Sequence, residues 1–436
     1  MYCKRFTSGI LFKLVRMILQ KAPPKFMRGQ GGTMSNRALR ALYVLTIVLA
    51  LCALAFVVIV SATSGSYMEK TYALPRNADY SRQFEDGRVQ LISYGILASS
   101  AHNMQSWRVE LEEEQSFLLY ADAEKRLAAD ADGRELMISQ GTFLQNIKLA
   151  AAEKGMGLEI ELFPDGQPDE ENFDESLKQL PVARVVITES QANTESGAAE
   201  GFDYIARATA NRSPYIAAPD AEQIEKLEGL SGEGFEIAVL NSPADIERIG
   251  NYAVRGKAFE YANDTVVGQL AKITRLNEYQ KNQKPFGLSA EGEGLKGINL
   301  SLAESASTLI PALNSREATT KRQVKNSRKL AAATQAYLLL TTPGSAREQQ
   351  VEAGMIYQQI VLLCHSMGLA VQPVSQPLAS FDGSVRALKA EFYADYVPSG
   401  GQAQMLVRVG VPQKAFPGGV RQSALSIVSG ESSDPA

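Results

Sequence analysis

One short polar segment gathers side chains that suit the binding of a planar ligand. Residues 95–107 read Gly-Ile-Leu-Ala-Ser-Ser-Ala-His-Asn-Met-Gln-Ser-Trp and include the only tryptophan and one of the two histidines of the 436-residue chain. Amide side chains donate and accept hydrogen bonds, as the edge of a ring rich in heteroatoms requires. The segment therefore indicates a binding loop, and from the residues alone an ordinary polar loop is the other interpretation. The candidate contacts are Ser99, Ser100, His102, Asn103 and Gln105.

The composition excludes several other kinds of site. Two histidines and three cysteines build neither a histidine-rich metal centre nor a Cys₄ zinc site, and the cysteines are too dispersed for a disulfide scaffold. Cys364 and His365 are neighbours in a predicted helix, where they would not face each other as a nucleophile and its base. A net charge of −4 argues against nonspecific binding of nucleic acid. We therefore expect no metal and no nucleic acid.

Two stretches of mixed helix and strand must position the loop. In residues 70–188, apolar periodicity predicts helices over 86–98 and 135–154 and strands over 107–111, 117–120 and 181–188. In residues 202–423, it predicts helices over 220–229 and 347–367 and strands over 235–240, 331–341, 370–374 and 405–411. A polar linker over 189–201 separates the two stretches, and a flexible tail follows over 424–436. The pattern predicts an α+β fold.

A long segment of the second stretch lacks this periodicity. Residues 270–330 are polar and charged, with little regular spacing of apolar side chains. Such a segment in a compact protein is more often a functional lid or a mobile loop than a packed element. We therefore expect a lid-like insertion.

The amino-terminal part differs sharply from the rest in charge. Residues 1–68 hold nine lysines and arginines and no acid, while the remaining 35 basic and 48 acidic residues give the body a net charge of −13. Residues 41–62 then form an uncharged run of 22 residues, enough to cross a bilayer as one transmembrane helix. The basic leader, residues 1–40, predicts a cytoplasmic amino terminus and a body on the far side of the membrane. A cleaved signal peptide, and a start at Met34, are the alternatives.

The loop resembles the A-P-S-x-H-N-x-Q-P-W segment of the nitroreductase family of flavin-dependent oxidoreductases. The chain is most similar to the Acg-like branch, in which two nitroreductase-like halves lie in one polypeptide. The further matching segments are Tyr120–Asp122, Arg126–Leu127, Asp130–Glu135, Ser139–Gly141, Asn146, Gly354, Gly368–Ala370, Ser375–Pro377 and Gln404–Gly410. The resemblance covers roughly residues 80–425, and it depends on the order and spacing of these motifs together.

The resemblance implies FMN as the cofactor. In this family FMN lies between two subunits, one of which supplies arginines for the phosphate while the other supplies the loop over the ring. Arg207, Thr209 and Arg212 resemble the family's phosphate-binding segment, in which Ala208 replaces a second arginine. Arg421 resembles the basic residue near the carboxy terminus that contacts the phosphate in this family. Ser375 and Gln376 fall where the family places groups beside flavin N5.

The chain contains each of these parts only once. The resemblance therefore implies one flavin site per chain, built across two tandem half-repeats that form an internal pseudo-dimer, so that the protein is a monomer. Ser99 and Ser106 replace the prolines of the family's loop, which predicts a less rigid loop and a lower flavin affinity.

The expected function is that of a membrane-anchored FMN oxidoreductase that reduces a nitroaromatic, a quinone or a similar acceptor. No acid–base residue is required from the chain, since the flavin carries the chemistry. The electron donor is NAD(P)H or, if the body lies outside the cytoplasm, a membrane quinol. The alternatives are a flavin-binding protein with little turnover, serving flavin storage or redox protection, and a degenerate module used only for interaction.

Overall fold

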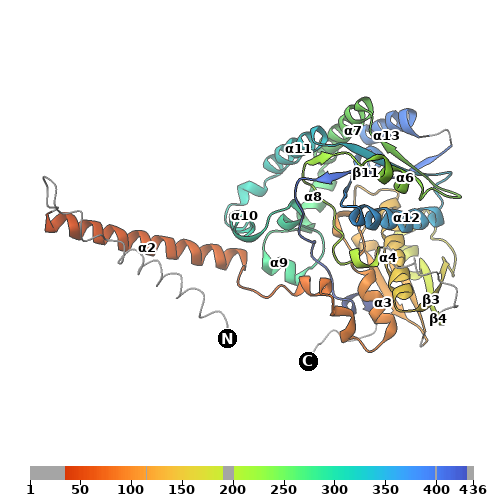
Figure 1. Ribbon diagram of the computed structural model, residues 1–436, viewed down its shortest axis with the longest axis horizontal. Helices are drawn as coiled ribbons and strands as arrows, with labels where there is room; N and C mark the ends of the chain where they lie inside the picture. Colours follow the sequence, from red (N-terminus) through yellow and green to blue (C-terminus); the bar gives the residue numbers. More distant parts are fainter. Residues whose placement is uncertain (1–34, 114, 190–200, 398–399, 430–436) are drawn as a thin grey trace. The chain divides into compact units, whose positions relative to one another are not determined.

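The computed structural model describes residues 35–113, 115–189, 201–397 and 400–429 (Figure 1). Most of the predicted leader, nearly all of the linker over 189–201 and the end of the tail over 424–436 lie outside these residues. The chain divides into two compact units, residues 1–58 and residues 59–436.

One long apolar helix begins in the first unit and ends in the second. Helix α2 (Asn36–Ser64) contains the uncharged run over 41–62, and its mean hydropathy reaches 3.0 in a window whose side chains are not buried. In the part of the chain that the structure describes, this is the one helix long and apolar enough to cross a membrane. The helix therefore agrees with the predicted span.

The second unit begins with a five-stranded sheet. Helix α3 (Gly87–Gly95) leads into β1 (Trp107–Leu111) and β2 (Ser116–Ala121), and these are followed by α4 (Arg134–Glu153), β3 (Met156–Leu162), α5 (Phe173–Gln179) and β4 (Ala183–Glu189). The strand order is β12-β1-β2-β4-β3, in which all pairs except β1 with β12 are antiparallel. The predicted elements of the first half are all present, within a few residues at their ends.

A second sheet follows the same plan. Its elements are α6 (Ala221–Glu228), β6 (Glu236–Leu240), β9 (Ala336–Thr342), α12 (Arg347–Ser366), β10 (Ala370–Pro373), α13 (Gly383–Tyr396) and β11 (Gln402–Pro412). The strands lie in the order β10-β11-β9-β6, and β5 (Tyr215–Ala217) also pairs with β11. This order matches β3-β4-β2-β1 of the first sheet, element for element. The chain therefore contains two tandem half-repeats in an α+β fold, as the sequence predicts.

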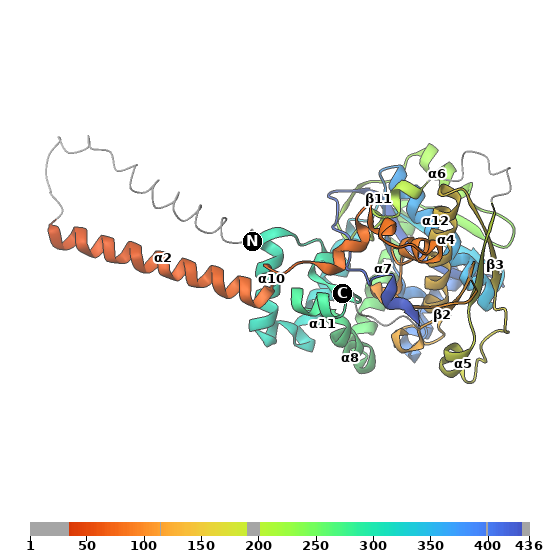
Figure 2. The same ribbon diagram turned by 90° about the horizontal axis from the view of Figure 1, so that it is seen from below.

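Helices α4 and α12 hold the two halves together. Each is 20 residues long and starts with Arg-Glu, and each carries a glycine at its eighth position, Gly141 in α4 and Gly354 in α12. A Cβ atom on Gly141 would lie 1.8 Å from the backbone oxygen of Val351, and one on Gly354 would lie 2.1 Å from that of Ile138. The helices thus cross backbone to backbone, which only glycine permits. Side chains of both helices belong to the large core shared by the two sheets. Figure 2 shows α4 and α12 side by side.

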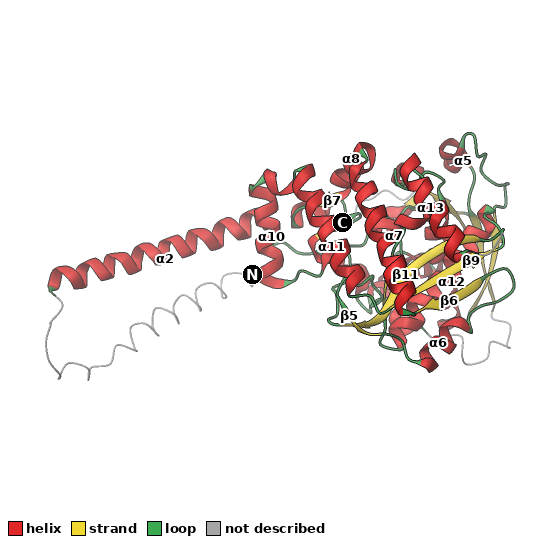
Figure 3. Cartoon of the chain, turned by 90° about the horizontal axis from the view of Figure 1, so that it is seen from above, coloured by secondary structure: helices red, strands yellow, loops and turns green. Residues whose placement is uncertain are grey.

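The halves differ in the segment between their first two strands. In the first half β1 and β2 form a hairpin, whereas the second half places five α-helices, two short 3-10 helices and two short strands between β6 and β9. These are α7 (Pro243–Ala262), α8 (Asp264–Ile273), β7 (Thr274–Arg275), α9 (Glu278–Gln283), β8 (Leu288–Ser289), α10 (Gly297–Leu309) and α11 (Arg316–Ala332). Helices α7 and α13 pack on the second sheet through one apolar cluster, on the opposite face from α12 (Figure 3).

The segment over 270–330 is therefore largely helical rather than a loop. Helix α11 packs along α7, and it shows little apolar periodicity because none of its residues is fully buried. The same helix extends to Ala332, so the predicted strand over 331–341 begins only at Ala336.

The carboxy-terminal segment crosses back to the first half. After β11 the chain runs to β12 (Val428–Ser429), which pairs in parallel with β1. Residues 420–422 hydrogen-bond the loop that follows α3 on the way. The sheet of the first half therefore takes its fifth strand from the carboxy-terminal segment.

A buried ionic cluster fixes the middle of the insertion. Lys281 is fully buried and lies 3.0 Å from Glu278, 3.0 Å from Glu291 and 2.7 Å from Glu304. Lys70 pairs with Glu278 and Glu291, and the Tyr72 hydroxyl donates to Glu278 at 2.7 Å. Three carboxylates thus share two ammonium groups. Burial, together with repulsion from the other two carboxylates and against the attraction of Lys281, raises the pKa of Glu304 to about 7.

The helix crossing predicts that Gly354→Ala destabilises the protein by about 2–4 kcal/mol, because the added methyl group has no room. Gly268→Ala is the matched control, since Gly268 lies in α8 with nothing within 4 Å of its Cβ position. Alanine there should leave stability unchanged or raise it by about 0.5–1 kcal/mol. Both variants are measured by denaturant unfolding of the full chain in detergent, followed by the fluorescence of buried Trp107. If Gly354→Ala is as stable as Gly268→Ala, the close helix crossing is contradicted.

The ionic cluster predicts a pH dependence. Between the ordinary pKa of 4.5 and about 7, folded Glu304 keeps a proton that the unfolded chain has lost, so its contribution to stability falls as the pH rises. Glu304→Gln removes this loss. The stability of the variant relative to wild type should therefore increase by on the order of 1–2 kcal/mol from pH 4.5 to pH 8. Glu317→Gln is the control, because Glu317 is exposed, and its stability should follow that of the wild type at every pH. If the stability of Glu304→Gln also runs parallel to that of the wild type, the raised pKa of Glu304 is refuted.

Candidate functional site

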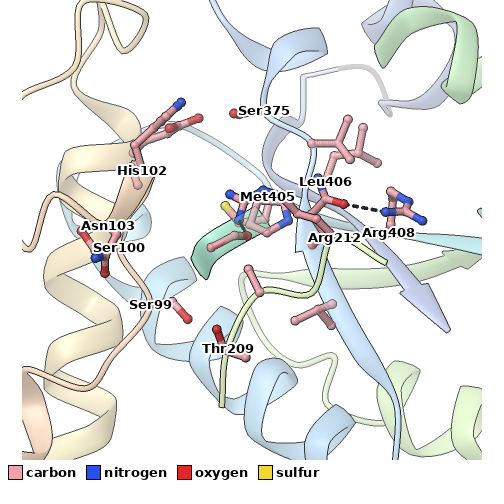
Figure 4. Close-up of a pocket in the computed structure, with 18 of the residues that line it drawn as sticks. Ser99, Ser100, His102, Asn103, Thr209, Arg212, Ser375, Met405, Leu406 and Arg408 are labelled. Atoms are coloured by element: carbon pink, nitrogen blue, oxygen red, sulfur yellow. Dashed lines mark hydrogen bonds between the residues drawn. The ribbon is translucent and has the colours of Figure 1, made fainter. Parts of the chain in front are cut away.

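A cavity of about 270 Å³ lies between the two halves. The loop over 99–103 and the start of α4 form one wall, and residues 208–212, 371–376 and 405–408 form the other. Figure 4 shows Ser99, Ser100, His102 and Asn103 on one side of the cavity, facing Thr209, Arg212, Ser375 and Arg408 across it. Residues 287–293 and one face of α11 also line it. Residues of both halves therefore line the cavity.

The loop after α3 has an unusual backbone. His102, Asn103 and Gln105 have φ values of 47°, 57° and 51°, a region that non-glycine residues rarely adopt. Such strain persists only where the surroundings hold it, and it is concentrated at functional sites. Here the Ser100 hydroxyl accepts from the Gln105 N–H at 2.9 Å, and the Asn103 carbonyl accepts from the Gly287 N–H at 2.8 Å. The loop is thus tied to the insertion of the other half.

Not every predicted loop residue faces the cavity. Gln105 is fully buried, and its side chain donates to the Pro285 carbonyl and accepts from the Gln422 N–H. It holds the loop against the carboxy-terminal segment instead of lining the site. Trp107 is also in the core, where its indole donates to the Ser139 carbonyl at 2.7 Å. The predicted Ser99, Ser100, His102 and Asn103 do line the cavity.

Of the site residues predicted in the second half, some line the cavity and others do not. Thr209, Arg212, Ser375 and Gln376 line the cavity, whereas Arg207 does not. Arg212 donates to the Gly292 carbonyl at 2.8 Å and lies 3.9 Å from Glu293. The Thr209 backbone contacts the His365 imidazole, so this histidine has a structural role. Cys364 is buried, which raises the pKa of its thiol to about 12 and keeps it unreactive.

Two arginines in the cavity wall are buried without an acidic partner. Among the described residues, no carboxylate lies within ion-pair distance of Arg408 or Arg421, which are 2% and 6% exposed. Arg408 donates to Thr334 and to Gln372 and stacks on Tyr215, while Arg421 donates to Asn103 and to backbone carbonyls. Burial lowers the pKa of both guanidinium groups. Buried charges are normally paired, so the wall offers a place for an anion.

Sequence reasoning selected Arg421 but did not select Arg408. Arg408 lies in β11, where it is flanked by Val407 and Val409. A charged residue within an apolar strand was the available signal, because such a side chain is rarely buried without a partner.

The rest of the wall is charged as well. Arg134 lies 3.5 Å from Glu135, and Lys257 lies 2.8 Å from buried Glu260, which also accepts from Gln376. Altogether five cationic side chains line the cavity against two carboxylates, Glu135 and Glu293. Burial lowers the pKa of His102 to about 4, so its imidazole is neutral at pH 7. The site therefore suits a ligand that combines a polar ring with an anionic group.

The chain is similar to known proteins in one family. Residues 234–411 match the family model of the nitroreductase family. The comparison with curated proteins finds no match.

Solved nitroreductase structures resemble about half of this chain. The nitroreductase-like protein of Bacillus cereus is 10% identical, over 52% of this chain and 92% of its own, with a TM-score of 0.29. The FMN-dependent nitroreductase NfnB of Mycobacterium smegmatis, solved in complex with NADPH, is 17% identical over 49% and 89%, with a TM-score of 0.30. An FMN-bound nitroreductase of Desulfitobacterium hafniense is 14% identical over 51% and 94%, with a TM-score of 0.29. The likeness to the nitroreductase family therefore rests on the match over residues 234–411.

Proposed function

We propose that the protein is an FMN-dependent oxidoreductase anchored in a membrane, with one flavin site per chain. The observation that carries this proposal is the cavity between the halves, in which a strained polar loop faces buried arginines that lack acidic partners. The family match over residues 234–411 supports the same cofactor. The Acg-like arrangement of two halves in one chain, acting as a monomer, is part of the proposal.

The residues of the cavity fit the two ends of FMN. A phosphate dianion needs charge-assisted donors, and Arg212, Arg408 and Arg421 are available to supply them. The Nε atom of Arg421 is buried without a hydrogen-bond partner among the described residues, as expected of a group that awaits one. At the other end, Ser99, Ser100 and Asn103 would hold the edge of the ring, with Ser375 and Gln376 on the opposite wall.

Bound FMN would supply the redox chemistry, by taking electrons from a donor and passing them to an acceptor such as a nitroaromatic or a quinone. The chain itself binds, orients and excludes water. His102 is a poor proton donor at pH 7, because its pKa of about 4 leaves the imidazole neutral. We therefore assign no acid–base residue.

The proposed location follows from α2 and the charge around it. The basic leader before an uncharged span favours a cytoplasmic amino terminus, with the body on the other side. A body outside the cytoplasm would meet a membrane quinol more readily than NAD(P)H. The NADPH complex of the Mycobacterium smegmatis relative supports a nicotinamide donor instead. Reduction of the purified flavoprotein by NADPH or by a quinol decides between the two.

A second candidate function is flavin binding with little turnover, for storage or redox protection. The observation in its favour is the wall over 287–293, which the buried cluster around Lys281 fixes in place against the cavity. A yellow protein that neither donor bleaches would favour this candidate. A protein that stays colourless after addition of FMN would leave only the interaction module.

The proposed phosphate contact makes a prediction with a matched control. Arg212→Gln removes a charge from the cavity wall, so FMN should bind at least about tenfold more weakly, the equivalent of about 1.4 kcal/mol or more. Arg207→Gln is the control, because Arg207 lies five residues earlier and outside the lining. Quenching of FMN fluorescence on titration with the full chain gives both affinities.

The opposite result is equally informative. If Arg207→Gln loses FMN and Arg212→Gln retains it, the phosphate contact belongs to the earlier arginine, and the assignment of Arg212 is wrong. If both variants bind FMN as wild type does, the phosphate lies away from this segment.

A further inference from the structure

An apolar stripe runs along the outer face of α10 and the short helix η7 (Pro311–Asn314) that follows it. Ile298 is 74% exposed and Leu309 is 53% exposed, and Leu302, Ile310 and Leu313 are exposed as well. Ile298, Leu302 and Leu309 fall within one narrow sector of the helix, because they are four and seven residues apart. Contiguous exposed apolar surface of this kind marks a site of contact with another molecule or with lipid.

The stripe lies at the end of the apolar span. Ser305 falls on the same sector of α10, and its hydroxyl lies 2.6 Å from that of Thr63, one residue after the uncharged run over 41–62. Tyr279 donates to the carbonyl of Ala62 at 3.2 Å and hydrogen-bonds Tyr67. Tyrosines are typical of the boundary between lipid and water. If the run over 41–62 spans the bilayer, Thr63 is at this boundary, and so is α10.

The next helix adds positive charge. Helix α11 carries six basic residues and one acid in a body whose net charge is −13. Lys321, Lys325, Arg328 and Lys329 are exposed on one face, whereas Gln323, Asn326 and Leu330 on the opposite face line the cavity. Basic residues beside an apolar helix face are typical of segments that bind anionic lipid surfaces. Helix η7 lies between α10 and α11 in the chain and contacts both helices.

We propose that α10, η7 and the basic face of α11 form a membrane-docking surface, which rests on the anionic lipid surface at the end of the protein's own span. The proposal depends on the anchor assigned under the proposed function, and it adds that the body lies against the bilayer. We assign lipid as the binding partner of this surface for two reasons. Ser305, in the same sector of α10 as the stripe, contacts Thr63 at the end of the apolar span, and the next helix, α11, is basic. The opposite face of α11 lines the cavity, so docking brings the cavity wall close to the membrane, within reach of a lipid-soluble acceptor such as a quinone.

The test uses the full chain in liposomes of phosphatidylglycerol and phosphatidylcholine. Cys3 and Cys52 are replaced by serine, buried Cys364 is kept, and an environment-sensitive NBD fluorophore is attached at Leu302→Cys or Leu309→Cys. We expect a blue shift of NBD emission and quenching by doxyl-labelled lipids. Ile216→Cys is the matched control, since Ile216 is also an exposed apolar residue, at 63%, but lies on β5, and its label should show neither effect.

A charge variant tests the basic face separately. Lys321→Glu, Lys325→Glu and Lys329→Glu together change residues outside the cavity lining. This triple variant, or liposomes of phosphatidylcholine alone, should reduce the doxyl quenching at position 309 severalfold, and high salt should do the same.

The outcomes separate the surface from the anchor. Flotation of the chain with liposomes after carbonate extraction tests the anchor alone. A chain that floats, with no doxyl quenching at 302 and 309, overturns the docking surface and leaves the anchor in place. A blue shift that grows with protein density and is not quenched by doxyl lipids would assign the stripe to a second copy of the chain. A chain that does not float overturns the anchor and the docking surface with it.

Discussion

The close crossing of α4 and α12 is the contact on which the rest of the structure depends. Gly141 and Gly354 let the two backbones meet, and no other residue fits at either position without displacing a main-chain carbonyl. The crossing also carries the polar bond from Gln358 to Asn146, and Gln358 accepts from the N–H of Ser99 at the start of the binding loop. The glycine crossing therefore fixes both the register of the two halves and the position of the loop over the cavity.

The two halves differ in the segments that they contribute to the cavity. The first half supplies the long loop between α3 and β1, and the second half has only residues 229–235 between α6 and β6. Conversely, the segment with Thr209 and Arg212, the helical insertion and Arg421 all belong to the second half. Each half keeps what the other lacks, while the repeated strand order and the Arg-Glu starts of α4 and α12 preserve their common plan.

Regular elements could be predicted from the sequence more fully than the contacts between them. Strand β1 and helices α4 and α12 carry strong apolar periodicity and lie where the sequence predicts them. The helices of the insertion could not be predicted in the same way, because α11 packs through half-buried polar and small side chains and α7 shows no strong apolar pattern. In the site, Gln105 is turned into the core by a backbone with positive φ, which no pattern of residue types encodes. Arg408 was missed because its strand reads as an apolar core element.

The central claim is that the two halves together make one flavin site. Native mass spectrometry of the full chain, released from detergent after saturation with FMN, counts flavins and chains in a single measurement. The account predicts a monomer that carries one FMN. A chain that carries two, or a chain that binds none while it remains folded, would contradict it.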